Sequence, residues 1–181
     1  MSTCQSIVQA AAAGSHEAFA TLVRQHQGPV RRFLLRMTQG DAMRADDLAQ
    51  ETFIRAWQHL RDFRGQSAFL TWLTRIAYRL FIDEQRKAKQ QTLSLDSDSS
   101  SPGIVALASA LPSRPGLTLD IDRALATLSE AERTCVTLQC IEGYAIRDIA
   151  EITGLNENTI KSHLLRGKRN LAEFLRTNGY R

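Results

Sequence analysis

The sequence predicts an all-α protein made of two small helical domains joined by a flexible linker, the C-terminal domain being a helix-turn-helix. Apolar residues recur at helical spacing along almost the whole chain, and no segment keeps the alternation of a β-strand for long. One stretch rich in serine, proline and glycine interrupts this pattern and is too long for a loop inside a compact domain. We therefore expect helical domains at residues 1–92 and 120–181, with the linker at 93–119.

In the first domain, the apolar pattern predicts four helices, and Gly28-Pro29 can kink the second. Ser15 is a plausible N-cap for the second helix and Ser67 for the fourth. The expected helices are Ile7–Ala13, one carrying an apolar stripe from Phe19 to Met37, Ala45–Leu60 and Phe69–Lys89.

In the second domain, Ser129 and Glu132 fit a capping box, and Asn156 fits an N-cap. The linker segment Ile104–Leu111 fits a short helix and a docking segment equally well. The expected helices of this domain are Asp120–Leu128, Glu130–Ile141, Ile146–Thr153 and Glu157–Arg176.

Composition argues against several classes of function. The chain has 3 cysteines, which give no disulfide framework, and it shows no nucleophile–base set, metal-ligand cluster or glycine-rich phosphate loop. We expect no catalytic residue, cofactor, metal or small-molecule substrate. A secretory signal and a membrane span are also not expected, because no basic flank with an apolar run and no run of roughly 18 apolar residues occurs. The net charge of +4 favours a polyanionic partner only weakly.

The last two helices fit a DNA-reading helix-turn-helix. Gly154 supplies the tight turn, while Ile160 and Leu164 face inward. The opposite face of the second helix is polar and mostly basic, so its side chains can reach base edges or phosphates. An ordinary amphipathic helix pair with a solvated basic face is the alternative. The candidate DNA-binding residues are Asn158, Lys161, Ser162, His163, Arg166 and Arg169.

The helix Ala45–Leu60 carries a polar patch opposite its apolar side. Asp47, Gln50 and Glu51 cluster there at spacings of three and four residues. The patch suits a basic or polar protein partner, but acids at a helix start are also common without any partner. Physical reasoning leaves these two alternatives open. The residues expected to pack inward are Leu48, Phe53, Ala56, Trp57 and Leu60.

Cations and aromatic residues alternate from Phe63 to Lys89. Such a mixture suits single-stranded or melting DNA, because unpaired bases stack on flat side chains. Trp72 and Tyr78 have a simpler interpretation as core residues. The candidate residues for this surface are Phe63, Arg64, Trp72, Arg75, Arg79, Arg86, Lys87 and Lys89.

Two long motifs in this region resemble a known family. D-L-A-Q-E-T-F-I-R-A-W (Asp47–Trp57) and F-R-G-Q-S-A-F-L-T-W-L-T-R-I-A (Phe63–Ala77) are similar to the second conserved region of extracytoplasmic-function (ECF) sigma factors, group 4 of the sigma-70 family. The helix-turn-helix resembles their fourth region. The resemblance implies an alternative sigma factor that binds RNA polymerase core, reads −35 and −10 promoter elements and nucleates DNA melting.

The resemblance also assigns roles to positions. Asp47, Gln50 and Glu51 match the patch that grips the β′ clamp, which favours a protein partner there. The surface from Phe63 to Lys89 matches the −10-reading part, with Phe63 in the wall of a pocket for a flipped base and Trp72 at the melting edge. The basic face that includes Lys161 matches the −35-reading part.

One position departs from the family. Many members carry Asn where this chain has Arg79, and a cation cannot reproduce the paired donor and acceptor of an amide. We therefore do not transfer the usual −10 base preference. The acids of the clamp patch are intact, which argues against variants that need phosphorylation to supply negative charge.

The resemblance further implies the β subunit as a second polymerase contact, an anti-sigma factor as a regulator, and a role in stress response. It implies a cytoplasmic protein that an anti-sigma factor can hold at the inner membrane. The alternative is a conventional helix-turn-helix transcription regulator that does not replace the sigma subunit. Such a regulator normally dimerises on a palindromic site, and it would leave the clamp motif unexplained.

Overall fold

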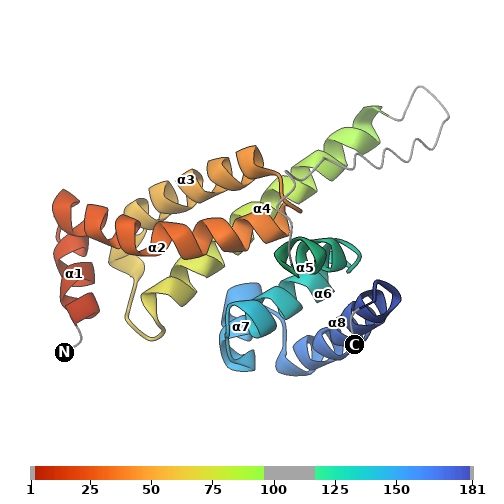
Figure 1. Ribbon diagram of the computed structural model, residues 1–181. Helices are drawn as coiled ribbons and strands as arrows, with labels where there is room; N and C mark the ends of the chain where they lie inside the picture. The colour runs from red at the N-terminus through yellow and green to blue at the C-terminus, as the bar shows by residue number, and fades with distance from the viewer. Residues whose placement is uncertain (1–2, 96–116, 180–181) are drawn as a thin grey trace.

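The computed structural model describes residues 3–95 and 117–179, all of whose regular elements are helical. The N-terminal half contains four α-helices and one short 3-10 helix (Figure 1). They are α1 (Thr3–Ala12), α2 (His16–Met37), α3 (Ala42–Gln58), η1 (Leu60–Asp62) and α4 (Phe69–Leu95).

The C-terminal half contains four α-helices and one π-helical segment. They are α5 (Leu117–Ala126), α6 (Glu130–Val136), η2 (Thr137–Ile141), α7 (Ile146–Thr153) and α8 (Glu157–Thr177). The all-α prediction is confirmed. The segment Ile104–Leu111 and most of the predicted linker lie outside the described residues, although α4 runs six residues beyond its expected end.

The expected helix caps are largely present. The Ser15 side chain accepts a hydrogen bond from the backbone N–H of Ala18, and Asn156 accepts one from the N–H of Thr159. Ser129 and Glu132 form the complete capping box. Each cap satisfies a backbone donor that has no partner inside its own helix.

Two expectations about helix starts are wrong. α3 begins at Ala42 rather than Ala45, because the Asp41 carboxylate accepts a hydrogen bond from the N–H of Arg44 and caps the helix earlier. Ser67 does not cap α4: the helix begins at Phe69, so Ser67 lies one position too early. Its hydroxyl instead donates a hydrogen bond to Glu151 in α7, at 2.8 Å.

The expected helix Glu130–Ile141 is not regular throughout. Its last five residues form η2, in which the N–H of Glu142 bonds to the carbonyl of Thr137, five residues earlier. Gly143 then adopts a positive φ of 77° and ends the segment. Apolar spacing alone cannot separate a π-helical turn from an α-helical one, which is why the sequence did not indicate it.

The N-terminal half is built around a core formed by α2, α3 and α4. Leu22, Leu34 and Leu73 are fully buried there, and Phe33 and Phe81 are nearly so. The helix α2 continues through Gly28 and Pro29 as a single element. Figure 1 shows α2 and α3 lying side by side, with α4 behind them.

In the C-terminal half, α6 packs closely against α8. Gly167 in α8 is buried, and a Cβ atom there would lie 2.7 Å from the Cγ2 atom of Val136 and 3.4 Å from the Cβ of Glu132. Glycine therefore allows the two helices to approach more closely than any other residue would. This contact sets the position of α8 within its half.

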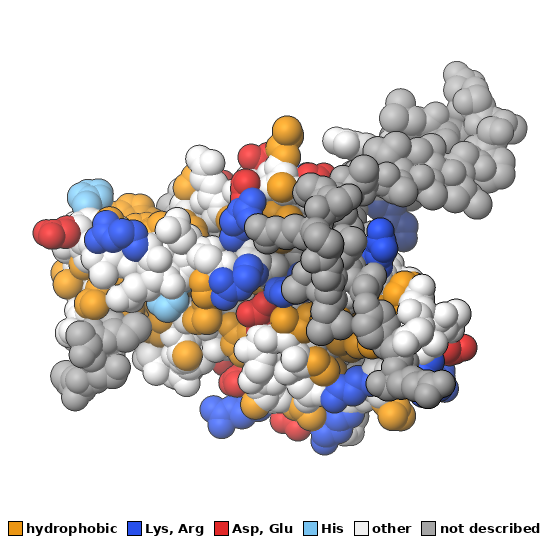
Figure 2. Space-filling model, viewed as in Figure 1, with side chains coloured by type: hydrophobic (Ala, Val, Ile, Leu, Met, Phe, Trp, Pro, Cys, Tyr) orange, Lys and Arg blue, Asp and Glu red, His pale blue; other side chains and the backbone are white. Residues whose placement is uncertain are grey.

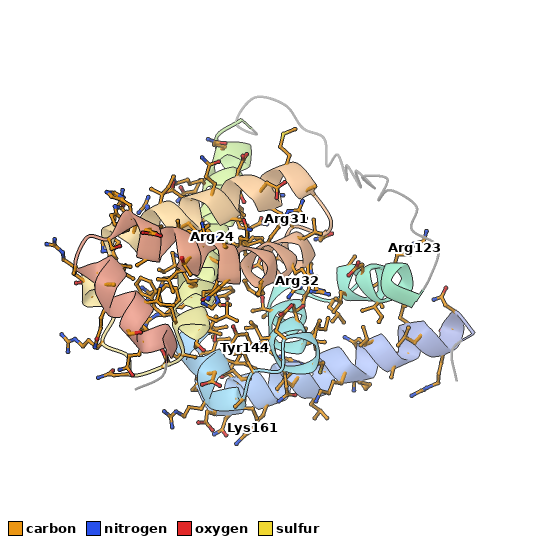
Figure 3. The ribbon with its side chains drawn as sticks, turned by 60° about the vertical axis from the view of Figure 1, so that its left-hand side comes forward. Arg24, Arg31, Arg32, Arg123, Tyr144 and Lys161 are labelled. Atoms are coloured by element: carbon orange, nitrogen blue, oxygen red, sulfur yellow. The ribbon has the colours of Figure 1, made fainter. Side chains whose placement is uncertain are left out.

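The two halves also pack against each other, mainly through α4 and α7. The hydroxyls of Thr74 and Tyr144 lie 2.9 Å apart, and Tyr144 in Figure 3 sits between the two groups of helices. Arg36 at the end of α2 pairs with Glu142 at 3.0 Å. The sequence did not predict these contacts.

A buried cation reinforces this packing. Arg133 of α6 is only 6% exposed. Its guanidinium donates to the carbonyl of Met37, the last residue of α2, and to that of Leu128. A positive charge at the C-terminus of α2 also complements the helix dipole. Among the described residues, no helix is both long enough and apolar enough to cross a bilayer.

The close contact at Gly167 gives a first prediction. We expect Gly167→Ala to lower the free energy of unfolding by about 1–3 kcal/mol, because the new methyl group must displace Val136. Urea unfolding followed by circular dichroism measures this. Leu165→Ala, on the same helix but 75% exposed, is the control and should change the free energy by less than about 0.5 kcal/mol. Equal stability of Gly167→Ala and the wild type would contradict the packing.

The burial of Tyr78 gives a second prediction. Burial raises the pKa of Tyr78 to about 12 from an ordinary value of 10.0, and the charge of Glu130 acts in the same direction. Between these two pH values the unfolded chain releases the phenol proton while the folded protein keeps it, so stability falls as the pH rises. Burial also raises the pKa of Cys135 to about 11, which extends the fall to lower pH.

We therefore expect Tyr78→Phe to lose less stability than the wild type between pH 10 and 12. Urea midpoints measured across this range test the expectation, with comparison at pH 8 to correct for any difference in packing. Parallel pH profiles for the two proteins would show that Tyr78 does not contribute.

Candidate polymerase and nucleic-acid interfaces

The polar patch on α3 borders an open apolar groove. Asp47 and Gln50 are exposed, whereas Glu51 is half-buried and accepts a hydrogen bond from Arg55 at 2.6 Å. The groove lies between α2 and α3 and has a volume of about 800 Å³. Gln50 is one of its lining residues, so the patch and the groove form one continuous surface.

Aromatic side chains form much of the groove wall. Phe53 and Trp57, expected to pack inward, are half-buried: both pack against the edge of the core and also line the groove. Trp57 stacks on His16 with ring centroids 4.9 Å apart and contacts Phe19 at 4.8 Å. The other residues that were expected to pack inward are buried, which confirms the prediction for Leu48, Ala56 and Leu60.

The groove rim carries further features that the sequence analysis missed. Arg31 of α2 forms a two-bonded ion pair with Asp46 of α3, and the hydrogen bond from Arg31 lowers the pKa of that carboxyl. Met43 and Ile54 are exposed apolar side chains on α3, at 77% and 44%. Ile54 lines the groove and adds to its apolar area, whereas Met43 is outside the lining.

The aromatic residues of the candidate −10 surface pack on one another. Phe63 is half-buried, and its ring lies 5.4 Å from both Phe69 and Trp72. His26 of α2 completes the cluster, with its ring 5.3 Å from Phe69, and burial lowers the pKa of His26. Arg64 is exposed in the loop that follows Phe63. The rings are therefore held in place by packing on one another, without nucleic acid.

Four of the cations of this surface, Arg75, Arg79, Arg86 and Lys89, lie along one side of α4, and Lys87 lies on a neighbouring side. Arg75 is half-buried, whereas the other four are exposed. A cavity of about 390 Å³ brings Trp72 together with Arg75 and Arg79, and His59 and Arg55 also line it. Neither His59 nor Arg55 was singled out from the sequence. The exposed cations of α4 are Arg79, Arg86, Lys87 and Lys89.

The helix-turn-helix forms as expected. Gly154 ends α7 in the left-handed conformation, with φ of 75°, and Ile149, Ile152 and Ile160 are fully buried between α7 and α8. Figure 3 shows Lys161 near the start of α8, where it points away from the rest of the protein. The candidate residues exposed on α8 are Asn158, Lys161, Ser162, Arg166 and Arg169.

Some side chains on this face have intramolecular partners. His163 is half-buried, and its Nδ1 atom lies 3.2 Å from the guanidinium of Arg166. Arg166 is also 3.6 Å from Glu132 of α6. Lys161 lies 4.0 Å from Glu157, a loose pair that solvent screens. In Figure 2, lysine and arginine side chains lie along α2 and over the C-terminal helices at the foot of the molecule.

The structure places the C-terminal half beside one of the three candidate surfaces, the one on α4. A cavity of about 970 Å³ is lined on one side by cations of α4 and on the other by residues Glu151–Leu155 of α7 and the turn. Among the described residues, no group of three or more histidine, cysteine, aspartate or glutamate side chains could hold a metal ion.

Comparisons with known proteins identify both halves. Residues 22–91 match the family described as Sigma-70 region 2, and residues 118–171 match Sigma-70, region 4. The chain is 30% identical over 175 residues to an ECF RNA polymerase sigma-E factor of Haemophilus influenzae, covering 92% of each protein. It is 31% identical over 173 residues to the ECF RNA polymerase sigma factor SigW of Bacillus subtilis, covering 90% of this chain and 91% of SigW.

Solved structures agree with these matches. The chain is similar to the sigma factor RpoE of Bartonella quintana in complex with the anti-sigma factor NepR, with a TM-score of 0.71, 28% identity and coverage of 87% of this chain and 96% of that one. It shares its fold with CnrH in complex with the cytosolic domain of CnrY, at a TM-score of 0.67 and 23% identity, over 96% of this chain and 97% of that one.

Proposed function

The chain belongs to the ECF sigma factors of the sigma-70 family and acts as an alternative sigma factor for RNA polymerase, and we propose which of its surfaces meet the polymerase and the promoter. The observation that carries the proposal is the presence, in one chain, of both sigma regions in order, each with a candidate surface on it. Sigma factors are initiation factors and not enzymes, so RNA synthesis belongs to the polymerase. A conventional regulator is not favoured, because it would leave region 2 unexplained.

The polymerase core binds, in this proposal, along the groove between α2 and α3. Its apolar, aromatic wall supplies area to bury, and Asp47, Gln50 and Glu51 supply charge and hydrogen bonds at the rim. An apolar centre with a polar border is the usual composition of a protein–protein contact. The partner is the β′ clamp, and the C-terminal half contacts the β subunit.

The promoter is read by two separate surfaces. The loop after Phe63 and the cations of α4 bind the −10 element, where aromatic side chains take up unstacked bases. The exposed face of α8 enters the major groove at the −35 element. These roles correspond to domains at 1–92 and 120–181 with a linker at 93–119. Arg79 is exposed beside Trp72, so we expect a −10 preference that differs from that of members with Asn there.

Regulation by an anti-sigma factor is the third part of the proposal. Two of the solved structures that resemble this chain are sigma factors in complex with an anti-sigma factor or its cytosolic domain. We propose a partner of the same kind here, with the sigma factor in the cytoplasm, held at the inner membrane until a stress signal releases it.

The clamp surface gives a third prediction. We expect Asp47→Lys/Glu51→Lys to reduce sigma-dependent run-off transcription at least tenfold. Two positive charges then replace the two negative charges at the rim and repel a basic partner. The assay uses purified core polymerase and genomic fragments from the source organism, with and without the chain. Direct binding to core polymerase by size-exclusion chromatography should fall in parallel.

The control is Glu173→Lys, the same kind of charge change at an exposed position on α8, away from both the patch and the groove. It should transcribe like the wild type. If Asp47→Lys/Glu51→Lys transcribes as well as Glu173→Lys, the patch is not the polymerase contact. If the wild type binds DNA but supports no core-dependent transcript, the sigma-factor function itself fails.

The recognition face gives a fourth prediction. We expect Lys161→Ala to weaken binding to a −35 duplex and to lower the slope of log affinity against log salt by roughly one, as for the loss of one phosphate contact. Fluorescence anisotropy of the polymerase holoenzyme on labelled promoter DNA measures both quantities. Arg176→Ala, exposed at the other end of α8, is the control and should leave the slope unchanged. Equal slopes for Lys161→Ala and the wild type would remove Lys161 from the interface.

A further inference from the structure

The N-terminal helix α1 lies outside the matched sigma region, yet it packs beside the loop of the proposed −10 surface. Sigma-70 region 2 matches from residue 22 onward, whereas α1 is Thr3–Ala12. The helix contacts α2 and η1, and Figure 1 shows it next to the loop that leads from η1 into α4. The proposed polymerase and promoter surfaces include no residue of α1.

Tertiary packing holds α1 in place. The helix has only 10 residues, and a helix of that length is marginal in water by itself. Val8 and Ala11 are 5% and 2% exposed, and Ile7 and Ala12 are half-buried against the same core. The position of α1 is therefore fixed by the surface on which it packs.

The loop Phe63–Ala68 depends on its surroundings for its shape. In the part of the chain that the structure describes, backbone hydrogen bonds bracket the loop but do not cross it. The N–H of Phe63 bonds to the carbonyl of Leu60 at 3.2 Å, and that of Trp72 bonds to the carbonyl of Ala68 at 3.2 Å. Side chains outside the loop must therefore define its path between these two bonds.

The helix α1 reaches this loop at two points. It packs on η1, which ends at the residue before Phe63. The side-chain amide nitrogen of Gln5 also lies 3.7 Å from the position that a Cβ atom on Gly65 would occupy, so it is close to the backbone in the middle of the loop. Gly65 has a positive φ of 70°, and the chain turns there. α1 thus limits movement at the start and the middle of the loop.

His26 of α2 limits movement at the other end. Its ring lies 5.3 Å from Phe69, and Phe69 packs on Phe63 at 5.4 Å and on Trp72 at 5.6 Å. The Nε2 atom of His26 is buried and has no hydrogen-bond partner among the described residues, and burial lowers the pKa of the imidazole. His26 therefore acts here as a neutral flat ring, and not as a donor or a charge.

We propose that α1 and His26 are positioning elements for promoter opening: they hold the loop Phe63–Ala68 and its aromatic cluster in the shape that receives an unstacked base, without touching the DNA themselves. A preformed site binds more tightly, because the binding step no longer has to order it. The role in opening rests on the proposed function. The support of the loop does not, because it is a property of the free protein.

Hydrogen exchange in the free full-length protein measures this support directly. Gln9 is exposed on α1, and Gln9→Pro breaks the helix because proline lacks an N–H and its ring clashes with the carbonyl of Gln5. We expect the amide of Phe63 to exchange roughly tenfold faster in this variant, because its local opening becomes easier. The amide of Trp72 should exchange roughly tenfold faster in His26→Ala for the same reason.

Two matched variants are the controls. Gln9→Ala keeps the helix, and His26→Phe keeps a flat ring at a position where the imidazole nitrogen has no partner among the described residues. Both should exchange like the wild type. The amide of the buried Ala56 in α3 should be unchanged in all four variants, which verifies that the core is intact.

Promoter opening by the holoenzyme tests the functional half of the proposal. Permanganate oxidation of unpaired thymines, on a promoter fragment taken from the run-off assay, measures the rate of opening. We expect Gln9→Pro and His26→Ala to slow opening by roughly fivefold or more, since the loop must then be ordered during the reaction. Gln9→Ala and His26→Phe should open the fragment like the wild type, and all four should bind core polymerase normally by size-exclusion chromatography.

Unchanged exchange at Phe63 in Gln9→Pro, or at Trp72 in His26→Ala, overturns the proposal. So does faster exchange with an unaltered rate of opening, because the support would then have no consequence for the promoter. A wild-type holoenzyme that opens no fragment contradicts the proposed function instead, and the exchange rates alone then decide whether α1 and His26 hold the loop.

Discussion

The burial of two different sides of α4 is the constraint on which the rest of the structure depends. At about 100° per residue, Leu73, Ala77 and Phe81 fall on one side of the helix, and all are at most 1% exposed against the N-terminal core. Thr74 and Tyr78 lie on the next side, toward the C-terminal half. The side that remains carries the cations.

One helix therefore supplies the core, the contact between the halves and the proposed DNA surface. Anything that shifts α4 against α2 and α3 moves all three together. Anything that releases α7 changes only the contact between the halves and leaves the core intact.

The contact between the halves combines strong and weak elements. Arg133 is buried and bonded to backbone carbonyls, so its removal would leave the last carbonyl of α2 without this partner. The three side-chain contacts at α7 are ordinary hydrogen bonds and one ion pair, each with a net contribution of about 1 kcal/mol. Together these contacts define one arrangement of the two halves.

Much of the fold was predictable from the sequence because it depends on local chemistry. The caps at Ser15, Ser129 and Asn156 and the left-handed turn at Gly154 follow from side chains within a few residues. The start of α3 was predicted wrongly because more than one residue could cap the helix, and Asp41 caps it three residues earlier than expected. The predicted cap at Ser67 failed because of a tertiary contact: the Ser67 hydroxyl bonds to Glu151 of α7, a helix distant in the sequence.

The sequence indicated which residues lie on the candidate surfaces, but it did not indicate the grooves and cavities that these residues line. Asp47 on α3 and most of the basic face of α8 are exposed, as helical spacing indicated, whereas Glu51 and His163 are half-buried. The same spacing predicted that Phe53 and Trp57 pack inward, and they do pack against the core, but spacing could not show that they also line an open groove between α2 and α3. Contacts such as Tyr144–Thr74 join residues far apart in the chain, and no pattern in one sequence encodes them.

The positions of the two tryptophans have a practical consequence. Trp57 stands in the wall of the groove between α2 and α3, stacked on His16, and Trp72 stands beside the cations of α4. The chain has only these 2 indoles. Replacing either one with phenylalanine leaves a single tryptophan, so fluorescence excited selectively at the indole would report occupancy of one surface at a time in the unlabelled protein.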